Sequence, residues 1–348
     1  MKPVKVGFEE SIASLVVQSG RCVGCGACVR VCPFNCLEYV DEKPNLVKKC
    51  EVCGICSQAC PQYDFSQSNI ENFMFGRTRN DDEAFGVYKG LVLARATNGQ
   101  ILEICQDGGA VTALLLFALK SNLIEGAVVA KSSEKKPFFP VPSFATTAEE
   151  ILRSAGTKYF YSPNILALAE AVEKNKRCIA FVGTPCHIRA IRKMQLARLK
   201  KYVEPLKLLI GLMCSECFDY EGLMENYIHR KLGIDPNHIR KINIKGRMHV
   251  TLNMKTVAIP LAEAKQFARK NCHFCQDFSS EFADISAGGL GLEGWTFLII
   301  RTEKGKELVS DAARAGKIET RNANEEPKAL KLLVKLSREK QAVVERKS

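Results

Sequence analysis

Two cysteine-rich stretches near the start of the chain share one pattern: Cys22–Pro33 is CVGCGACVRVCP and Cys50–Pro61 is CEVCGICSQACP. Both follow C-x2-C-x2-C-x3-C-P, and each residue of the second lies 28 positions after its counterpart, so the segment is an internal duplication. This spacing is typical of chains that hold two 4Fe–4S clusters, in which the fourth cysteine of each repeat binds the other repeat's cluster. The sequence therefore predicts two clusters, one ligated by Cys22, Cys25, Cys28 and Cys60 and the other by Cys50, Cys53, Cys56 and Cys32.

Other interpretations fit these cysteines less well. Structural zinc also takes four thiolates, but zinc sites use two C-x2-C pairs rather than this repeated unit. The C-x3-C-x2-C motif of radical-SAM enzymes is absent. The first residues, MKPVKVGFEESIAS, lack the apolar core of a secretion signal, which predicts a cytoplasmic protein with reduced thiols rather than a disulfide framework. Cys36 lies outside the pattern and is interpreted as a buried spare thiol.

The composition is that of a globular protein, with 46% apolar and 25% charged residues among 348. No run of 18 apolar residues occurs, so no transmembrane helix is predicted. The net charge of +12 is uneven: ten Lys and Arg lie between Lys174 and Lys207, with only Glu204 against them. Such a run is either a solvated face or a site for an acidic ligand or partner. Nucleic acid is disfavoured because no aromatic residues alternate with these charges.

Strand and helix patterns alternate after a polar, irregular stretch at 61–90. Strands are predicted at 91–97, 126–131, 178–182, 207–212, 240–245, 250–254 and 295–300, and helices at 109–120, 147–155, 165–174, 185–198 and 220–231. The alternation predicts an α/β fold, α+β over the whole chain, with a largely parallel sheet. We expect a bacterial-type two-cluster ferredoxin domain at 1–75 with a linker to about 88, a larger α/β domain at 88–320, and a basic C-terminal helix at 321–348, whose helical pattern starts at about Pro327.

Three features of the larger domain point to ligands. The turn at 106–109 (QDGG) opens a helix after a strand, which suits either a phosphate or a plain capped turn. Loops at 156–159 (GTKY) and 183–186 (GTPC) follow helices or strands, where ligands of α/β sheets collect. A further group of cysteines either binds another cluster or consists of unliganded buried thiols: Cys186, Cys214, Cys217, Cys272 and Cys275.

A literal G-x-G-x-x-G at Gly289–Gly294 is not interpreted as a dinucleotide fingerprint, because the residues that follow it form a strand pattern rather than a helix. Its glycines remain candidates for lining a cofactor pocket. His187 and His273 each neighbour a candidate ligand cysteine, and neither is assigned a role.

Several segments, in this order, resemble the family of beta subunits of coenzyme F420 hydrogenases and dehydrogenases. They are CQDGGAVTALLLFAL (105–119), GTKYFYSP (156–163), FVGTPCHIRAIRK (181–193), IGLMCSECFDY (210–220) and CHFCQDFSSEFADISAGGLGLEGWTFLIIRTEKG (272–305). With the ferredoxin domain in front, the chain is most similar to the family's electron-input subunits in archaeal dehydrogenases of reduced coenzyme F420.

This resemblance implies a flavin domain that binds FAD and exchanges hydride with coenzyme F420. It also implies a third 4Fe–4S cluster, ligated by Cys186, Cys214, Cys272 and Cys275, with Cys217 competing with Cys214 for one position. The residues expected at FAD are Gln106, Gly108, Gly109, Thr112, Thr157, Lys158, Tyr159, Gly183 and Thr184.

In this hypothesis, reduced coenzyme F420 delivers a hydride to FAD, and single electrons leave through the clusters to a membrane-bound complex or a soluble ferredoxin. No protein nucleophile or base is required, so no catalytic residue is assigned. The acidic tail of coenzyme F420 is expected at the basic face of Arg189, Arg192 and Lys193. The alternatives are a related reductase of tetrapyrroles and a relay subunit without flavin. The protein is expected in the cytoplasm, either free or attached to the cytoplasmic face of a membrane complex.

Overall fold

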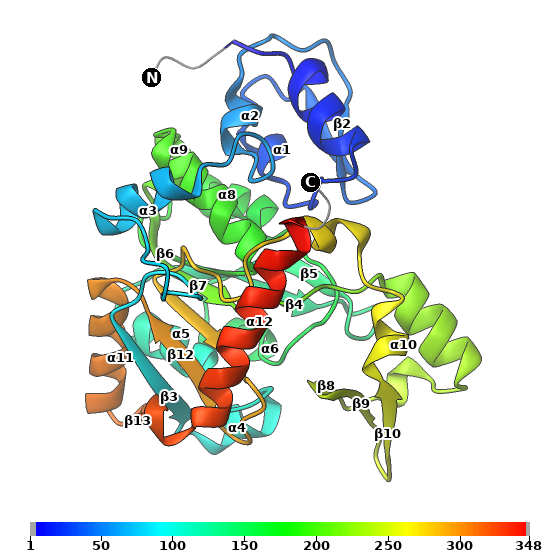
Figure 1. The fold of residues 1–348 in the computed structure, drawn as a ribbon, viewed down its shortest axis with the longest axis vertical. Coiled ribbons are helices and arrows are strands. Elements are labelled where there is room, and N and C mark those ends of the chain that lie inside the picture. The colour runs from blue at the N-terminus through cyan, green and yellow to red at the C-terminus, as the bar shows by residue number, and fades with distance from the viewer. Residues whose placement is uncertain (1–4, 346–348) are drawn as a thin grey trace.

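The computed structural model describes residues 5–345. The N-terminal segment lies at one end of the molecule, at the top of Figure 1, above a large central sheet. It contains a π-helix η1 (Glu9–Gln18), the short helices α1 (Ala27–Val31) and α2 (Ile55–Ala59), and an antiparallel hairpin of β1 (Leu37–Val40) and β2 (Lys43–Leu46).

The two cysteine repeats adopt the same local structure. Helix α1 starts after Gly26 and α2 after Gly54, and both glycines have positive φ, 77° and 71°. Glycine adopts this conformation readily, so the chain can turn sharply between the second and third cysteines of each repeat. Each helix ends at an extended cysteine, Cys32 or Cys60, as expected for a residue that precedes proline.

The central sheet has eight strands in the order β13-β3-β12-β11-β7-β6-β4-β5. Its strands are β3 (Gly90–Ala96), β4 (Gly126–Ser132), β5 (Pro140–Ala145), β6 (Ile179–Gly183), β7 (Leu206–Leu212), β11 (Ile285–Gly288), β12 (Thr296–Ile300) and β13 (Ile318–Asn322). The prediction of a largely parallel sheet was wrong, because only the central strands β11, β7, β6 and β4 are mutually parallel. Both flanks pair antiparallel, which makes the sheet mixed.

Helices cover both faces of this sheet. One face packs against α5 (Ala110–Lys120), α6 (Ala148–Arg153) and α11 (Glu303–Arg314). The other packs against α7 (Leu168–Glu173), α8 (Pro185–Leu196) and α9 (Lys200–Val203). The apolar cluster on this second face also contains Val23, Ala27 and Val31, so the N-terminal segment shares a core with α8. The remaining helical elements around the sheet are α4 (Gly99–Ile104) and η2 (Asn164–Ala167).

A second, antiparallel sheet of β8 (Lys241–Lys245), β9 (Arg247–Thr251) and β10 (Thr256–Pro260) projects to one side (Figure 1). It packs with the π-helix η3 (Glu221–Lys231) in a separate apolar cluster. The strand predicted at 250–254 instead spans residues 247–251. It ends there because residues 252–255 form a turn in which Leu252 N donates to Lys255 O. Short helices η4 (Pro236–His238), α10 (Leu261–Lys265) and η5 (Lys270–Phe274) complete this region.

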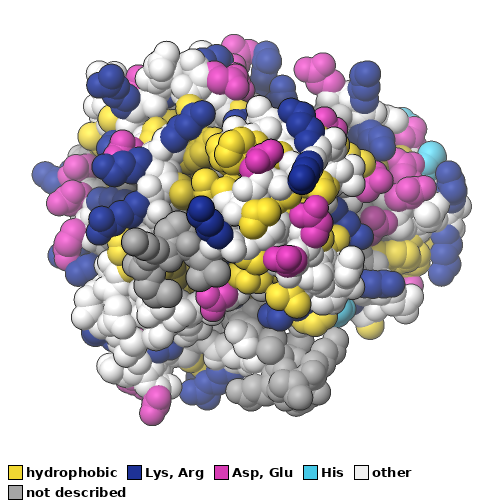
Figure 2. Space-filling model, turned by 90° about the horizontal axis from the view of Figure 1, so that it is seen from above, with side chains coloured by type: hydrophobic (Ala, Val, Ile, Leu, Met, Phe, Trp, Pro, Cys, Tyr) yellow, Lys and Arg dark blue, Asp and Glu magenta, His cyan; other side chains and the backbone are white. Residues whose placement is uncertain are grey.

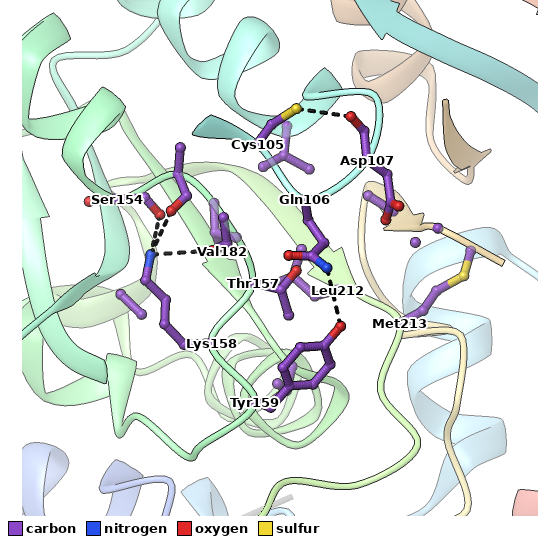
Figure 3. Close-up of a pocket in the computed structure, with 18 of the residues that line it drawn as sticks. Cys105, Gln106, Asp107, Ser154, Thr157, Lys158, Tyr159, Val182, Leu212 and Met213 are labelled. Carbon is purple, nitrogen blue, oxygen red and sulfur yellow. Dashed lines mark hydrogen bonds between the residues drawn. The ribbon is translucent and has the colours of Figure 1, made fainter. Parts of the chain in front are cut away.

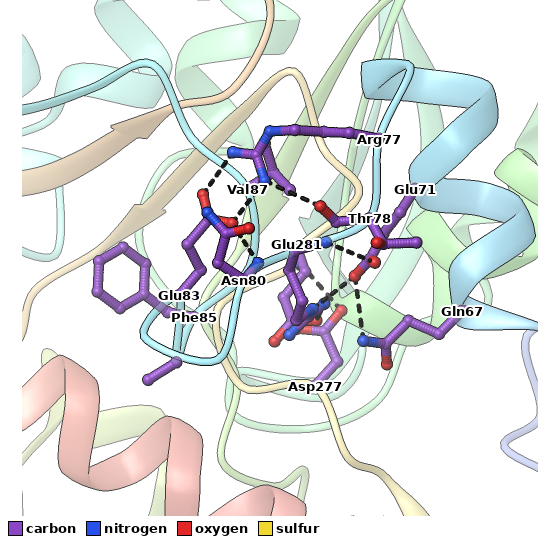
Figure 4. A network of polar contacts seen from close by, with 12 residues as sticks. Gln67, Glu71, Arg77, Thr78, Asn80, Glu83, Phe85, Val87, Asp277 and Glu281 are labelled. Carbon is purple, nitrogen blue, oxygen red and sulfur yellow. Dashed lines mark hydrogen bonds and ion pairs between the residues drawn. The ribbon is translucent and has the colours of Figure 1, made fainter.

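The expectation of an irregular stretch at 61–90 was also wrong, because it contains helix α3 (Gln67–Phe75). Ser66 caps its first turn by accepting from Asn69 N, and Gly76, with φ 70°, ends it. A buried polar network then fixes the following residues to the loop at 277–281 (Figure 4). In it, Arg79 lies between Glu71, at 2.5 Å, and Glu281.

The chain ends in the long helix α12 (Pro327–Glu345), after the short η6 (Ala323–Glu325). Its apolar residues Leu330, Leu333 and Val334 pack with Phe297 and Ile299 of β12, so the helix extends the layer on the second face. Packing of this helix onto its own chain is thus confirmed. Within residues 5–345, no helix is long and apolar enough to cross a membrane.

Candidate functional site

A large cavity opens at the carboxyl edge of the four central parallel strands (Figure 3). Its wall includes Val182 and Gly183 at the end of β6, Leu212 at the end of β7, and Gly288 at the end of β11. The cavity has a volume of about 330 Å³, at the lower end of the roughly 300–1,000 Å³ of an ordinary small-molecule site. Ligands of α/β folds bind at this edge because the loops there diverge.

Eight of the nine residues expected at FAD line this cavity: Gln106, Gly109, Thr112, Thr157, Lys158, Tyr159, Gly183 and Thr184. Gly108 does not. It lies beneath the wall, where a β-carbon would stand 2.5 Å from Ala94 O and 2.6 Å from Thr296 N. Its role is therefore to let the turn approach β3 and β12.

Two helix N-termini face the cavity. Helix α5 begins after Gly109, whose φ of 69° only glycine tolerates easily, and α8 begins after Thr184. Both helices are long enough, at 11 and 12 residues, to carry a helix dipole. Their positive dipole ends favour anions such as phosphate.

Lys158 supplies a full positive charge to the same wall. Its ammonium donates to the carbonyl oxygens of Ser154 (2.6 Å), Ala155 (2.9 Å) and Gly156 (3.3 Å) at the end of α6 (Figure 3). Burial lowers its pKa to about 8. No carboxylate of residues 5–345 pairs with this ammonium. Its three N–H groups already donate to the three carbonyls, so it would act on an anionic ligand through its charge rather than through a hydrogen bond.

The opposite wall is polar and comes from the small sheet. Gln106 donates to Ile242 O (3.2 Å), and the Tyr159 hydroxyl accepts from Ile244 N (3.2 Å). Lys241 donates to Gln106 O (2.8 Å). These contacts hold the 106–109 turn against β8 and so give the cavity a fixed shape.

Sequence reasoning assigned no role to two side chains that contribute to this cavity. Lys245, on β8, stands 4.0 Å from the carboxylate of Asp107, whose pKa burial raises. His187, on α8, also lines the wall, and burial lowers its pKa to about 3, so it is neutral. The glycines at 289 and 291 line it too, after β11 and before β12, which confirms that this G-x-G-x-x-G opens no helix.

The eight cysteines of the two repeats surround two separate spaces. One space is lined by Cys22, Cys25, Cys28 and Cys60, and the other by Cys32, Cys50, Cys53 and Cys56. Thus the fourth cysteine of each repeat joins the first three of the other repeat. Cys36 also lines the second space, where its N–H donates to Cys32 Sγ (3.3 Å). Within residues 5–345, no three His, Cys, Asp or Glu side chains are arranged to hold a single metal ion.

The five further cysteines gather between the cavity and the N-terminal segment. Burial, reinforced by the thiols of Cys275 and Cys214, raises the pKa of Cys186 to about 11, although a hydrogen bond with Thr184 opposes it. A hydrogen bond with Cys217 raises the pKa of Cys214, and Cys217 N donates to Cys272 Sγ at 3.5 Å. Cys217 borders the cavity as well, so both competitors for the fourth position lie in this group.

The three cysteine groups lie in a row in space, leading away from the cavity. Burial raises the pKa of Cys25, and the thiols of Cys60 and Cys186 add to that rise. Burial also raises the pKa of Cys28 in the same group, and Cys56 adds to that rise. Cys56 belongs to the Cys50 group, which is farthest from the cavity and is called the outer group. Thr184 lines the cavity, and its Oγ1 is 3.1 Å from Cys186 Sγ. The order is therefore cavity, Cys186 group, Cys22 group and Cys50 group.

The basic residues expected at the tail of coenzyme F420 do not line the cavity. Arg189 stacks 3.7 Å from the ring centre of Phe65. Arg192 is buried, where it donates to Phe282 O (2.8 Å) and Asp284 Oδ1 (3.1 Å). Lys193 donates to backbone oxygens of the N-terminal segment, including Ser57 O at 3.3 Å. This part of the basic run therefore joins elements of the fold, which corrects the expectation.

Comparison with known proteins agrees with these features. Residues 91–169 match the family model of the "coenzyme F420 hydrogenase/dehydrogenase, beta subunit N-term" and residues 176–326 that of its C terminus. Residues 15–38 match a "4Fe-4S binding domain".

Relatives match over most of their length. The coenzyme F420 hydrogenase subunit beta of Methanothermobacter thermautotrophicus is 38% identical over 75% of this chain and 94% of its own. A component of the F(420)H(2) dehydrogenase of Methanosarcina mazei is 32% identical over 84% of this chain and 82% of its own. A chain of the F420-reducing NiFe hydrogenase complex from Methanosarcina barkeri superposes with a TM-score of 0.73 at 33% identity, over 77% of this chain and 94% of that one.

Proposed function

We propose that this chain, which belongs to the family of coenzyme F420 hydrogenase/dehydrogenase beta subunits, oxidises reduced coenzyme F420 by hydride transfer to a bound FAD. Single electrons then leave through three 4Fe–4S clusters to a partner complex or a ferredoxin. The observation that carries this proposal is the contact between Thr184, which lines the cavity, and Cys186, which begins the row of cysteine groups.

A flavin supplies the one chemical property that the chain lacks, because it accepts a hydride and releases electrons singly. The residues of the cavity fit such a group. The N-terminal turns of α5 and α8, together with the buried ammonium of Lys158, match the charge of a pyrophosphate. The side of the cavity that is open to solvent would admit the deazaflavin ring of the substrate beside the flavin. Lys245 then faces its acidic tail.

The chain's task is positional and electrostatic rather than that of a nucleophile. Gly109 lets the backbone approach the ligand, and Tyr159 and Gln106 hold the wall against β8. Val182 and Leu212 at the ends of β6 and β7 add apolar side chains to the wall, which would shield a bound ring from water on that side. No residue of the chain is required to move a proton in a direct hydride transfer.

Electrons would leave over the outer group of cysteines. Phe34 and Val52 flank this group and are 49% and 46% exposed. On the face seen from above, Lys and Arg side chains are interspersed with Asp and Glu around hydrophobic ones (Figure 2). Names of relatives associate the family with hydrogenase and dehydrogenase complexes, so we expect an electron-accepting complex, or a ferredoxin, to dock here.

The test is to quantify iron, acid-labile sulfide and FAD in the anaerobically purified full chain, then add reduced coenzyme F420. We expect about twelve irons per chain, bound FAD, and bleaching of the flavin on addition of the substrate. Zinc in place of iron and sulfide would overturn the proposal. If the protein holds clusters but no FAD after reconstitution, it is an electron-relay subunit without flavin. If its flavin is not reduced by reduced coenzyme F420 but is reduced by ferredoxin, the enzyme acts on another substrate.

Loss of the Lys158 charge should weaken FAD binding. Two opposite charges about 8 Å apart in a partly buried site attract by about 2 kcal/mol, so Lys158→Met should weaken binding by roughly tenfold or more. Lys174→Met, on exposed α7 surface, is the matched control and should have no effect. Fluorescence titration of the apoflavin protein measures both.

The Lys158 ammonium should also make the affinity for FAD depend on pH. Its pKa of about 8 lies below the usual 10.5 because burial disfavours the ammonium. An anion favours the ammonium, so wild-type affinity for FAD should be highest below pH 8 and decline as pH rises through it. In Lys158→Met this decline should disappear. An equal decline in both proteins would exclude Lys158 as its source.

A further inference from the structure

One arginine lies between the Cys22 group and the Cys186 group. Arg269 immediately precedes η5, the element that carries Cys272, and its side chain is 9% exposed. Its own backbone joins the Cys186 group, because its N–H donates to Cys217 O and its carbonyl accepts from Cys272 N, both at 2.9 Å.

Its guanidinium contacts the N-terminal segment. It forms an ion pair with Glu42 in the turn between β1 and β2, at 2.7 Å, and donates to Val23 O at 3.2 Å. A β-carbon on Gly24 would lie 3.0 Å from Arg269 Nη2, so the arginine fills the space beside the turn after Cys22. Two residues further on, Asn271 donates to Cys22 O.

The other side of the guanidinium stacks on Tyr161, with Cζ 4.0 Å from the ring centre. The Tyr161 hydroxyl in turn lies 3.0 Å from His187 Nε2 and 3.9 Å from Cys186 Sγ. Tyr161 is buried and lies near both Cys186 and Cys25. One planar cation therefore lies in the packed region between the two cysteine groups and contacts residues on both sides.

This cation acts electrostatically on both groups. Burial raises the pKa of Cys22 and of Cys272, and in each case the Arg269 charge opposes that rise. The acidic side chain that faces it is Glu42. Arginine stays protonated throughout the physiological range, so its charge is constant.

We propose that Arg269 is a positioning residue for electron transfer: it holds the N-terminal segment against Tyr161 and favours the electron on the two clusters that flank it. Reduction adds one negative charge to a cluster, and a nearby buried cation stabilises that charge and raises the reduction potential. This inference rests on the proposed function, because it requires clusters in both cysteine groups.

The test uses three variants of the full-length holoprotein, compared by redox titration with cluster EPR signals. Arg269→Gln should make the potentials of the two flanking clusters more negative, by at least about threefold in the reduction equilibrium, which is ~30 mV for one electron. Arg269→Lys should restore most of that shift. Glu42→Gln removes the opposing charge and should shift the potential of the Cys22-group cluster in the positive direction.

Both Gln variants break the same ion pair, so loosened packing would shift the reduction potentials in the same direction in both. An electrostatic effect shifts them in opposite directions. The outer cluster is the internal control and should move least in all three. Unchanged potentials in both Gln variants, or shifts of the same sign, would overturn the inference. If Arg269→Gln loses its clusters, Glu42→Gln alone tests the inference: a positive shift in the potential of the Cys22-group cluster supports it, and an unchanged potential overturns it. Absence of clusters from the wild-type chain would instead overturn the proposed function.

Discussion

Replacing Cys25 with alanine should remove one complete cluster, so iron should fall by about a third, from roughly twelve to roughly eight per chain. Cys25 is 6% exposed and faces the same space as Cys22, Cys28 and Cys60. A cubane that loses a buried thiolate gains no replacement ligand, because the neighbouring side chains Val23 and Ala27 are apolar. Iron and sulfide analysis with EPR measures the loss.

Cys36→Ala is the matched control for this experiment. Cys36 is buried and lines the outer space, but it is not in the predicted ligand set. It should therefore retain all iron, with at most a change in the EPR spectrum of the outer cluster. Full iron in Cys25→Ala, or lost iron in Cys36→Ala, would contradict the assignment of ligands.

Arg301→Met should be the most destabilising single change outside the cysteine groups. Arg301 is fully buried and donates to Ser286 Oγ (2.7 Å), Val87 O (2.9 Å) and Ser279 Oγ (3.0 Å). Asp277 and Glu281 also favour its charge, which burial opposes by lowering its pKa. Removal of one member of a buried charged network costs about 3–5 kcal/mol, so the midpoint of thermal unfolding should be about 4–7 °C lower.

Arg153→Met makes the same substitution on the surface. Arg153 pairs with Glu149 in α6, and both side chains are 73% exposed. Such a pair contributes about 0–1 kcal/mol, so the midpoint of thermal unfolding should hardly move. Both proteins should be compared as anaerobic holoproteins, because cluster loss would itself lower the midpoint. Similar midpoints for the two variants would show that the network does not stabilise the fold.

The sequence predicted best where local chemistry dictates structure. The spacing around Cys22 and Cys50 predicted which thiols share a space, because the turn before the third cysteine and the proline after the fourth are local constraints. Helix α5 was evident from its glycine start and apolar run. Of the nine residues that the family resemblance predicted at FAD, eight line one cavity, although they are far apart in the chain.

The features that the sequence did not predict depend on tertiary pairing. Strands β5, β11 and β13 are short, and β5 contains two prolines, so none shows a clear strand pattern. The direction of β12 against β11 depends on the turn at 289–294 and cannot be read from either strand. Helix α11 was missed because Gly305 interrupts its pattern, and the structure requires that glycine, since a β-carbon would meet Asp284 O at 2.5 Å. Arg192 forms an ion pair with Asp284, which is distant in sequence. The sequence alone therefore gave no sign that the charge of Arg192 is paired.

The apolar core that joins the N-terminal segment to α8 has a consequence for damage by oxygen. Ala27 and Val31 are packed with Ile188 and Ile191 in a single cluster, and α8 also presents Cys186 and the edge of the cavity. Oxidative loss of iron from the Cys22 group would therefore loosen the helix beneath it. If FAD binds as proposed, air exposure should release it as a delayed event that follows iron loss, although the four cysteines of the Cys22 group do not line the cavity.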